Sequence, residues 1–460
     1  MTKYDAIIIG TGQAGVPLAI RLAGVGWKTA LIERALTGGT CINYGCTPTK
    51  TMIASARVAY LARRGKEFGV PAGDFNVDLK TVVSRKNAIV AQLHDSTQMQ
   101  LENTTNLDFM FGEASFTAEK TVSVSLNDGG KQELAAEYIF INTGGRTAVP
   151  KIDGLGTVDY LTSTTILDLE EIPKHLLIIG GSYIGLEFGQ MFRRFGSEVT
   201  VLDSAPRFLA KEDEDVANEL RKILEEDGIT IYAGATVEQI QKPSPMTVRA
   251  IINKEVKPIQ CSHILIAAGR TPNTDRLNLP IAGIKTDVRG YIVVDDKLET
   301  SVKGVYALGD VKGGPAFTHI SYNDHLVIVK NLLEKGNISI KDRPAPYCMF
   351  TDPELGRIGL TEQQARAQGY KIKVPTLPMT FVRRATETSE TRGVMKAVVD
   401  ANSGKILGVA VLGMGGGEIM TVMQMAMAGG ITYMELRDTI FAHPLWSESI
   451  NNLFMTLDEN

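Results

Sequence analysis

The sequence predicts an α/β fold with two Rossmann-like, three-layer ββα domains followed by a C-terminal α+β domain. Two observations carry this prediction. A βαβ pattern occurs twice without gaps, beginning at Ala6 and again at Leu176, an offset of 170 residues. From about residue 343 the pattern changes to alternating strands and a Met-rich helix. A chain of 460 residues is long enough for two to four domains.

The first βαβ unit has an apolar strand, a glycine turn, a helix and a second apolar strand. Its turn reads Gly10-Thr11-Gly12-Gln13-Ala14-Gly15. In such a turn Gly10 allows the tight bend, Gly12 lets the backbone approach a pyrophosphate, and Gly15 lets the helix pack on the strand. Glu33, 23 positions after Gly10, can accept a hydrogen bond from a ribose hydroxyl. Together these features predict a dinucleotide site.

The second unit repeats this order with one substitution. Gly180, Ser182 and Gly185 occupy the three turn positions, so serine replaces the middle glycine, and Asp203 takes the place of the acid. Serine is small enough for close approach, although this copy is the weaker signal. Two dinucleotide units in one chain indicate two dinucleotides, and the natural pair is a flavin and a nicotinamide.

Three further apolar strands end in small-residue turns of the kind that passes beside a cofactor. They are "YIFINTGGR", "HILIAAGRTPN" and "GVYALGD". The third places Asp310 at the strand exit, where a ribityl hydroxyl can bind it. Near the C-terminus, residues 395–413 predict a hairpin with a turn near Ser403-Gly404. The Met-rich helix at 419–428 is typical of a core or a subunit interface.

Composition narrows the classes of function. The net charge of −4 gives no electrostatic basis for binding nucleic acid or an anionic membrane. No apolar run reaches the ~18–20 residues of a membrane span. The N-terminal residues run directly into the glycine motif, which is not typical of a signal or transit peptide. We therefore expect a cytoplasmic protein, in which structural disulfides are rare. Cys261 reads as a small buried hydrophobe.

The stretch "GGTCINYGCTPTK" holds two of the four cysteines, Cys41 and Cys46. A zinc site needs four ligands, and none of the six histidines is near in sequence, so a redox pair is favoured. Residues five apart on an ideal helix have Cα atoms roughly 8–9 Å apart, whereas a disulfide needs less than about 7 Å. If the two cysteines bond, the segment must be only partly helical, which Gly45 and Pro48 suit. A helix N-terminus lowers a thiol pKa.

These motifs, together with "GGSYIGLEFG", "GRTPN", "ALGDVKGGPAFTHISYND" and "FAHPLWSES", resemble the class I pyridine nucleotide-disulfide oxidoreductases. Glutathione reductase, dihydrolipoyl dehydrogenase and mercuric reductase belong to that family. The resemblance covers essentially the whole chain, and the cysteine motif is highly specific. The variants "GCTPTK" and "HPLWSESINNLF" are most similar to the mercuric-reductase-like branch, which includes the reactive-chlorine-resistance flavoprotein that reduces Cu(II).

The resemblance implies roles for individual residues. Cys46 is the sulfur nearest the flavin, where it forms a charge-transfer thiolate, and Cys41 is the outer thiol that meets the substrate. Lys50 lies near flavin N5 and pairs with Glu187. The remaining FAD contacts implied are Gly10, Gly12, Gly15, Glu33, Thr40, Thr143, Gly144 and Asp310. Those implied for the nicotinamide side are Gly180, Ser182, Gly185, Asp203, Gly269 and Arg270.

His443 opens the "HPLWSE" motif. The resemblance implies that it comes from the partner subunit and serves the outer thiol as general acid and base, oriented by Glu448. A homodimer follows from this. The expected domains are 1–148 and 271–342 for FAD, 149–270 for NAD(P), and 343–460 for dimerisation. Asp203 favours NADH as the reductant, whereas Arg207 could instead bind the 2′-phosphate of NADPH.

The expected activity is transfer of electrons from NAD(P)H through FAD to a Cys41–Cys46 disulfide, and then to Cu(II), Hg(II) or a disulfide substrate. The chain departs from mercuric reductases because its last residues, "NNLFMTLDEN", hold no cysteine pair and no CxxC domain opens the sequence. That departure puts efficient Hg(II) reduction in doubt. Dihydrolipoyl dehydrogenase and a flavin redox sensor without rapid turnover stay open as alternatives.

Overall fold

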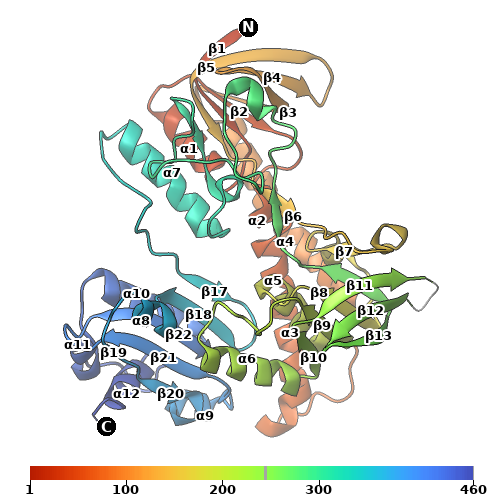
Figure 1. The fold of residues 1–460 in the computed structure, drawn as a ribbon, viewed down its shortest axis with the longest axis vertical. Coiled ribbons are helices and arrows are strands. Elements are labelled where there is room, and N and C mark those ends of the chain that lie inside the picture. Colours follow the sequence, from red (N-terminus) through yellow and green to blue (C-terminus); the bar gives the residue numbers. More distant parts are fainter. Residues whose placement is uncertain (243–245, 459–460) are drawn as a thin grey trace.

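The computed structural model describes residues 1–242 and 246–458, which form three sheet-based units (Figure 1). In the first unit β1 pairs in parallel with both β2 and β5, and β16 extends the sheet beyond β5. The strands are β1 (Thr2–Ile9), β2 (Thr29–Glu33), β3 (Leu107–Ala118), β4 (Thr121–Leu126), β5 (Lys131–Ile141) and β16 (Val305–Ala307). The helices are α1 (Gly15–Gly24), α2 (Gly39–Asn43), α3 (Cys46–Arg64), α4 (Leu79–Glu102) and α7 (Thr318–Leu332).

Two long strands give the first unit its second β layer. The first half of β3 pairs in parallel with β2, and its second half pairs antiparallel with β4. β5 likewise begins against β4 and continues beside β1. The sheet therefore splits into a parallel layer, which carries the glycine turn, and an antiparallel layer that covers it. With the helices, this is the predicted three-layer ββα arrangement.

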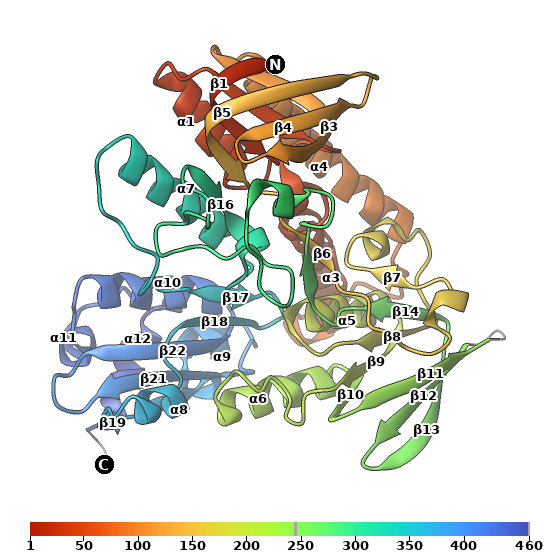
Figure 2. The same cartoon turned by 45° about the horizontal axis from the view of Figure 1, so that its top comes forward.

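The second unit has a parallel sheet in the order β10-β9-β8-β14-β7 and a separate antiparallel sheet, β11-β12-β13. Figure 2 shows the antiparallel sheet standing out at one corner of the molecule. The parallel-sheet strands are β7 (Leu161–Thr162), β8 (His175–Ile179), β9 (Glu198–Asp203), β10 (Ile229–Ala233) and β14 (His263–Ile266). The others are β11 (Thr236–Gln241), β12 (Met246–Ile252) and β13 (Glu255–Cys261), and the helices are α5 (Tyr183–Phe195) and α6 (Glu214–Glu226). Short strands β6 (Gly145–Thr147) and β15 (Arg270–Pro272) pair where the chain crosses between the units.

The two glycine turns share one geometry and differ at their middle position for a packing reason. A Cβ on Gly10 would lie 2.4 Å from the carbonyl oxygen of Asn142, so only glycine fits. A Cβ on Gly12 would lie 2.8 Å from Asn142 Oδ1. In the second unit Ala267 occupies the place of Asn142, since each donates its N–H to the last residue of the central strand. Alanine has no side-chain oxygen to clash, which explains why Ser182 is accepted there.

The C-terminal unit is a mainly antiparallel sheet with helices. β21 and β22 form the predicted hairpin around residues 403–404. Its strands are β17 (Tyr347–Met349), β18 (Glu354–Gly359), β19 (Ile372–Lys373), β20 (Thr376–Pro378), β21 (Val394–Asp400) and β22 (Ile406–Gly413). Its helices are α8 (Glu362–Ala367), α9 (Arg383–Glu387), α10 (Gly416–Ala428), α11 (Tyr433–Asp438) and α12 (Ser449–Met455). The Met-rich helix is α10, which buries Met420 and Met423 but leaves Met425 57% exposed.

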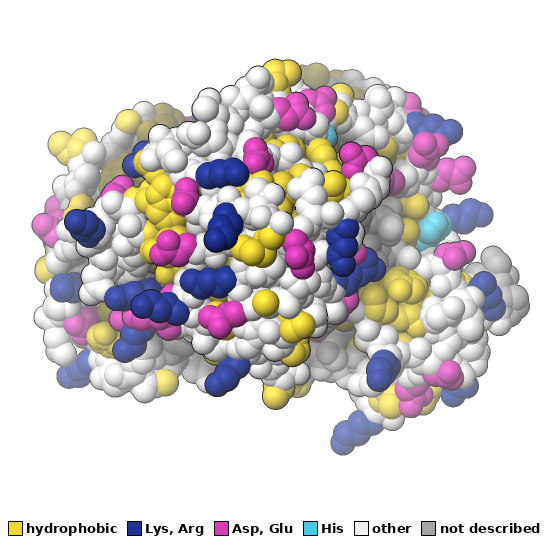
Figure 3. Space-filling model, turned by 90° about the horizontal axis from the view of Figure 1, so that it is seen from above, with side chains coloured by type: hydrophobic (Ala, Val, Ile, Leu, Met, Phe, Trp, Pro, Cys, Tyr) yellow, Lys and Arg dark blue, Asp and Glu magenta, His cyan; other side chains and the backbone are white. Residues whose placement is uncertain are grey.

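Surface features agree with the composition. Seen from above, basic and acidic side chains are interspersed (Figure 3). Across residues 1–242 and 246–458, no helix combines the length and apolarity that crossing a membrane requires.

Candidate active site

The cysteine segment is helical at both ends and broken in the middle. α2 ends at Asn43, and α3 begins at Cys46 after Gly45 adopts a non-helical conformation with φ −129° and ψ −112°. A Cβ on Gly45 would lie 2.9 Å from the carbonyl oxygen of Thr40, so glycine lets the two turns approach. Cys41 and Cys46 are free thiols here. The expected interruption of the helix is confirmed.

The surroundings of Cys46 favour its thiolate. The pKa of Cys46 is lowered to about 6, first by a hydrogen bond from Cys41, and further by the Thr318 hydroxyl and the Lys50 charge, although burial and Glu187 oppose the shift. Thr318, the first residue of α7, places its Oγ1 3.2 Å from Cys46 Sγ. The same contact with Cys46, together with burial, raises the pKa of Cys41. At neutral pH the pair is therefore one thiolate and one thiol.

Lys50 and Glu187 form the predicted ion pair, with Lys50 Nζ 2.7 Å from Glu187 Oε2. Glu187 is only 3% exposed, and its other oxygen accepts a hydrogen bond from the Phe350 N–H at 2.9 Å. The ammonium group also lies 4.6 Å from the centre of the Phe350 ring. A buried carboxylate needs such partners to remain charged.

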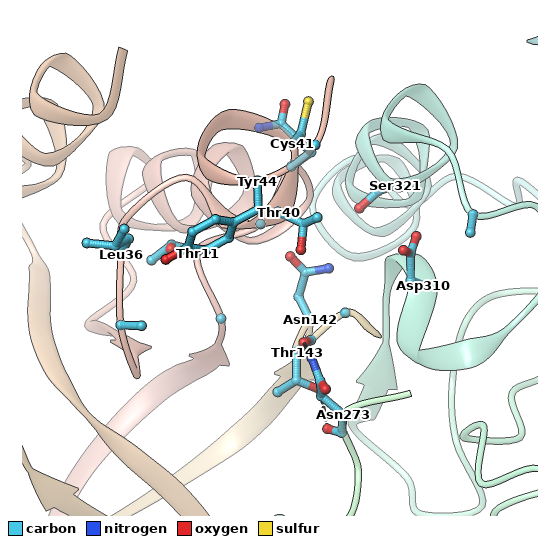
Figure 4. Close-up of a pocket in the computed structure, with 18 of the residues that line it drawn as sticks. Thr11, Leu36, Thr40, Cys41, Tyr44, Asn142, Thr143, Asn273, Asp310 and Ser321 are labelled. Carbon is cyan, nitrogen blue, oxygen red and sulfur yellow. Dashed lines mark hydrogen bonds between the residues drawn. The ribbon is translucent and has the colours of Figure 1, made fainter. Parts of the chain in front are cut away.

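A single elongated pocket joins the cysteine pair to the first glycine turn. Figure 4 shows Thr40 and Tyr44 on one side of it, with Asn142 and Thr143 opposite. The predicted site residues that line it are Gly10, Gly12, Glu33, Thr40, Cys41, Cys46, Lys50, Thr143, Gly144, Glu187, Arg270 and Asp310. Gly15 does not line the pocket. It packs against the glycine turn, where a Cβ on Gly15 would lie 2.0 Å from the Gly10 carbonyl oxygen.

The pocket fits a flavin adenine dinucleotide. Glu33 is held at the end of β2 by the N–H of Thr11 at 3.0 Å and the N–H of Ala35 at 2.9 Å. A Cβ on Gly39 would lie 2.8 Å from the Cα of Gly12, so side chains there would close the diphosphate position. At the other end burial raises the pKa of Asp310, against its ion pair with Arg270 at 3.4 Å. The buried Nε of Arg270 has no hydrogen-bond partner within the described protein.

Asn142 is a site residue that the sequence reasoning missed. Its Oδ1 accepts a hydrogen bond from the Gly15 N–H at 2.9 Å, and its Nδ2 donates to the Leu308 carbonyl at 3.0 Å. It therefore ties the start of α1 to the strand exit that carries Asp310. Its position could have indicated its role, because Asn142 directly follows β5, whereas the equivalent position in the second unit holds Ala267.

The residues predicted for the nicotinamide side, apart from Arg270, do not line this pocket, although Tyr183 and Ile184 of the second glycine turn do. The predicted residues outside it are Gly180, Ser182, Gly185, Asp203 and Gly269. Asp203 packs against the turn, since a Cβ on Gly181 would lie 2.8 Å from the Asp203 Cβ. Arg207 is engaged by its own loop, because it donates to the Ala210 carbonyl at 2.7 Å and the Glu212 carbonyl at 3.0 Å. Asp203, at the end of β9, accepts a hydrogen bond from the Ala205 N–H at 3.3 Å through Oδ1.

His443 and Glu448 meet as predicted, with Nδ1 2.9 Å from each carboxylate oxygen. His443 is 63% exposed and does not line the pocket of its own chain. Glu448 of the same chain therefore accounts for the orientation of the imidazole. The imidazole does not contact the cysteines of that chain through the pocket.

A thiol–thiolate pair at one end of a dinucleotide pocket, with a second dinucleotide unit beside it, defines a nucleotide-dependent disulfide oxidoreductase. The family model for "Pyridine nucleotide-disulphide oxidoreductase" matches residues 4–324, and that for its dimerisation domain matches residues 345–454. The chain belongs to this family, as the motif resemblance indicated. Flavoproteins of the family use FAD and NAD(P)H, and these are the cofactors of this chain.

Two relatives and one solved structure illustrate the branch. The probable pyridine nucleotide-disulfide oxidoreductase RclA of Escherichia coli (strain K12) is 41% identical over 458 residues, which cover 99% of each chain. The mercuric reductase of Lysinibacillus sphaericus is 36% identical over 459 residues, 100% of this chain and 83% of that protein. A solved structure described as the Cu(II) complex of the HOCl-induced flavoprotein disulfide reductase RclA from Escherichia coli has a TM-score of 0.91 and 40% identity, covering 99% of this chain and 100% of that one.

Proposed function

We propose that this flavoprotein reduces a metal ion, Cu(II) before Hg(II), with electrons that pass from NADH to the Cys41–Cys46 pair. The observation that carries the proposal is the thiol–thiolate pair that lines the pocket, with Cys46 exposed to it. Thiolates are soft ligands that bind copper ions, so the reduced pair can bind the ion to which it passes its electrons. The similarity to RclA, whose structure is described with Cu(II), supports the same ion here.

The proposed chemistry uses the residues in fixed roles. When bound, FAD supplies two-electron transfer between a nicotinamide and the cysteines. The first glycine turn, Glu33 and Asp310 would hold it, and Lys50 with Glu187 would lie beside its reactive end. The cysteine pair gives up two electrons and the Cys41 proton as its S–S bond forms, so one pair reduces two Cu(II) ions. His443 of the other chain in a homodimer, with its Nδ1 directed at Glu448, would take that proton on Nε2.

We propose NADH as the preferred reductant. Asp203 at the end of β9 can accept from a free 2′-hydroxyl, and its charge repels a 2′-phosphate. Arg207 donates to two carbonyl oxygens of its own loop, which engages it away from a 2′-phosphate. We propose that residues 1–148 and 271–342 bind FAD, residues 149–270 bind the nicotinamide nucleotide, and residues 343–460 form the dimerisation domain.

Dihydrolipoyl dehydrogenase is the second candidate. The enzyme of that name from Thermus scotoductus is 35% identical over 454 residues, and the His443–Glu448 pair suits thiol substrates. Oxidation of dihydrolipoamide with NAD⁺ separates this function from metal reduction.

The test is anaerobic steady-state oxidation of NADH with Cu(II), Hg(II) and oxidised glutathione, using Cys41→Ser as the control. We expect Cu(II) to be reduced fastest and the control to be nearly inactive. Hg(II) should inhibit, because it binds a dithiol tightly. Only Cys261 and Cys348 remain in the printed sequence to accept it, and Cys261 is 2% exposed. Sustained turnover of Hg(II) faster than Cu(II) would contradict the proposal.

A further inference from the structure

One face of α5 carries three polar side chains that are buried against the C-terminal unit. Glu187, Gln190 and Arg194 follow one another at spacings of three and four residues, so they lie on the same side of the helix. Each is at most 5% exposed. Burying a polar side chain costs free energy unless it is hydrogen-bonded. The hydrogen-bond partners of these three side chains therefore identify the segment that this face of α5 binds.

All three side chains bind the short connection between β17 and β18. Glu187 Oε1 accepts from the Phe350 N–H at 2.9 Å. Gln190 binds the backbone of Asp352 twice, because Oε1 accepts from its N–H at 2.7 Å and Nε2 donates to its carbonyl at 2.9 Å. Arg194 donates to the same carbonyl at 3.2 Å and also to the Asp352 carboxylate. We call residues 350–352 the docking segment.

The docking segment touches both members of the Lys50–Glu187 pair. Its first N–H holds one oxygen of Glu187 while Lys50 holds the other, and the Phe350 ring lies under the Lys50 ammonium. We infer that Gln190 and Asp352 are positioning residues, which fix the Lys50–Glu187 pair by clamping the docking segment of the C-terminal unit onto α5. This inference rests on the role proposed above for that pair.

Arg57 of α3 also binds the docking segment, through the carboxylate of Asp352. The Asp352 carboxylate accepts two hydrogen bonds from Arg57, at 3.0 and 2.8 Å. Arg57 lies seven residues after Lys50 on α3, which is two helical turns along the same face. Burial tends to raise the pKa of Asp352, but Arg194 and Arg57 outweigh it and hold that pKa below its usual value, so the carboxylate is charged. Asp352 thus joins α3 to α5 two turns from the ion pair.

The test replaces Gln190 with methionine, which keeps the length of the side chain and removes both hydrogen bonds to Asp352, together with one to the Asp227 carboxylate. In the protein without cofactor, hydrogen–deuterium exchange should become faster at the amides of Asp352 and of Phe350. The Phe350 amide donates its hydrogen bond to Glu187 and not to Gln190. Faster exchange at Phe350 would therefore show that the Glu187 carboxylate is held less firmly. In the flavin-loaded enzyme, rapid mixing with NADH should show flavin reduction slowed about tenfold, because only part of the free energy of the lost hydrogen bonds is felt at the Lys50–Glu187 pair. Reoxidation by Cu(II) should be unchanged.

The matched control is Glu390→Gln. Glu390 is buried in the same junction and binds Arg57 and Arg64, but it makes no bond to the docking segment. It should lower thermal stability without changing the rate of flavin reduction or the exchange at Phe350. Equal slowing by Glu390→Gln, or a wild-type rate in Gln190→Met, would overturn the inference. Where Gln190→Met does not fold, Asp352→Asn takes its place, with the same expectation and the same overturning results.

A third variant separates this inference from the proposed function. Glu187→Gln should slow flavin reduction by itself, and adding Gln190→Met should then slow it no further, because both act through the same carboxylate. Full additivity would overturn the positioning role. A wild-type rate in Glu187→Gln would instead reject the role proposed for the Lys50–Glu187 pair.

Discussion

Cys46 holds its charge because a thiol, a hydroxyl and an ammonium group outweigh the cost of burial. Its folded pKa lies below that of a free thiol, so the thiolate persists at neutral pH and is lost as the pH falls through about 6. In reduced enzyme, the long-wavelength band between the thiolate and the flavin should therefore be strong at pH 7 and fade around pH 6. Absorbance titration of anaerobically reduced enzyme measures this.

The two sulfurs should separate by substitution. Cys46→Ser should abolish the band, because the charged sulfur is gone. Cys41→Ser should show the band without any reductant, since Cys46 then has no disulfide partner and keeps Lys50 and Thr318 as neighbours. A band that survives in Cys46→Ser and disappears in Cys41→Ser would mean that the assigned roles are exchanged.

Asp203→Ala should weaken NADH more than NADPH. The substitution removes an acceptor for the 2′-hydroxyl and a charge that repels a 2′-phosphate. One charge-assisted hydrogen bond is worth about 1.5–3 kcal/mol, or roughly ten- to a hundredfold in affinity. The ratio of kcat/KM for the two nucleotides measures the effect. Arg207→Ala is the control and should leave the ratio unchanged, because that side chain is bound to its own loop. A ratio unaffected by Asp203→Ala would exclude Asp203 from ribose recognition.

Single residues were predictable from sequence only where a local motif contained them. The cysteine pair and its helix break followed from spacing and from Gly45, and the Lys50–Glu187 pair followed from the family resemblance. Gln190 and Asp352 carry no such signal, because they are 162 positions apart and meet only after two units pack together. Asn142 lies in the strand-end motif "YIFINTGGR", but its role was missed because its partner Gly15 is 127 positions away.

At the scale of elements, the 170-residue offset predicted both parallel sheets because each βαβ unit is specified locally. It did not predict that β3 and β5 each belong to two layers. The two halves of such a strand pair with different neighbours, and no difference in residue type marks the point where the partner changes. The middle turn position shows the same limit. Gly12 and Ser182 differ because of Asn142 and Ala267, which lie on another strand.

Asn142→Ala should loosen the contact between α1 and the exit of β16. It leaves the buried Gly15 N–H and Leu308 carbonyl without their partner, at about 1–3 kcal/mol for each unsatisfied group. The free energy of unfolding should fall, and the purified protein should lose FAD more readily on dilution. Denaturant unfolding and the absorbance of bound flavin measure the two effects. Ser182→Gly, at the turn of the second unit, should retain wild-type FAD content. Equal flavin loss in the two variants would contradict this role of Asn142.

At the scale of the whole molecule, the general acid and base lies far from the chemistry it is expected to serve. His443 belongs to the C-terminal unit and does not line the pocket of its own chain. Apolar residues flank it at the surface, with Ile440 98% and Leu445 50% exposed. Interfaces of obligate homodimers are rich in apolar groups, and this unit matches the family's dimerisation domain. We therefore propose a homodimer in which His443 of each chain serves the cysteines of the other.

A mixing experiment tests that arrangement. His443→Ala and Cys41→Ser homodimers should each be nearly inactive, because every site lacks one required group. After subunit exchange, half of the dimers should be mixed, and in each of these one site carries both defects while the other is intact. Activity should then return to about a quarter of wild type for random pairing in a twofold dimer. Native mass spectrometry should confirm the mixed dimers. A parallel mixture uses Arg221→Ala, on α6, in place of His443→Ala, and it shows whether subunit exchange by itself lowers activity. If mixed dimers form and no activity returns, His443 acts on the cysteines of its own chain, and the pocket must close around it by a movement of the C-terminal unit.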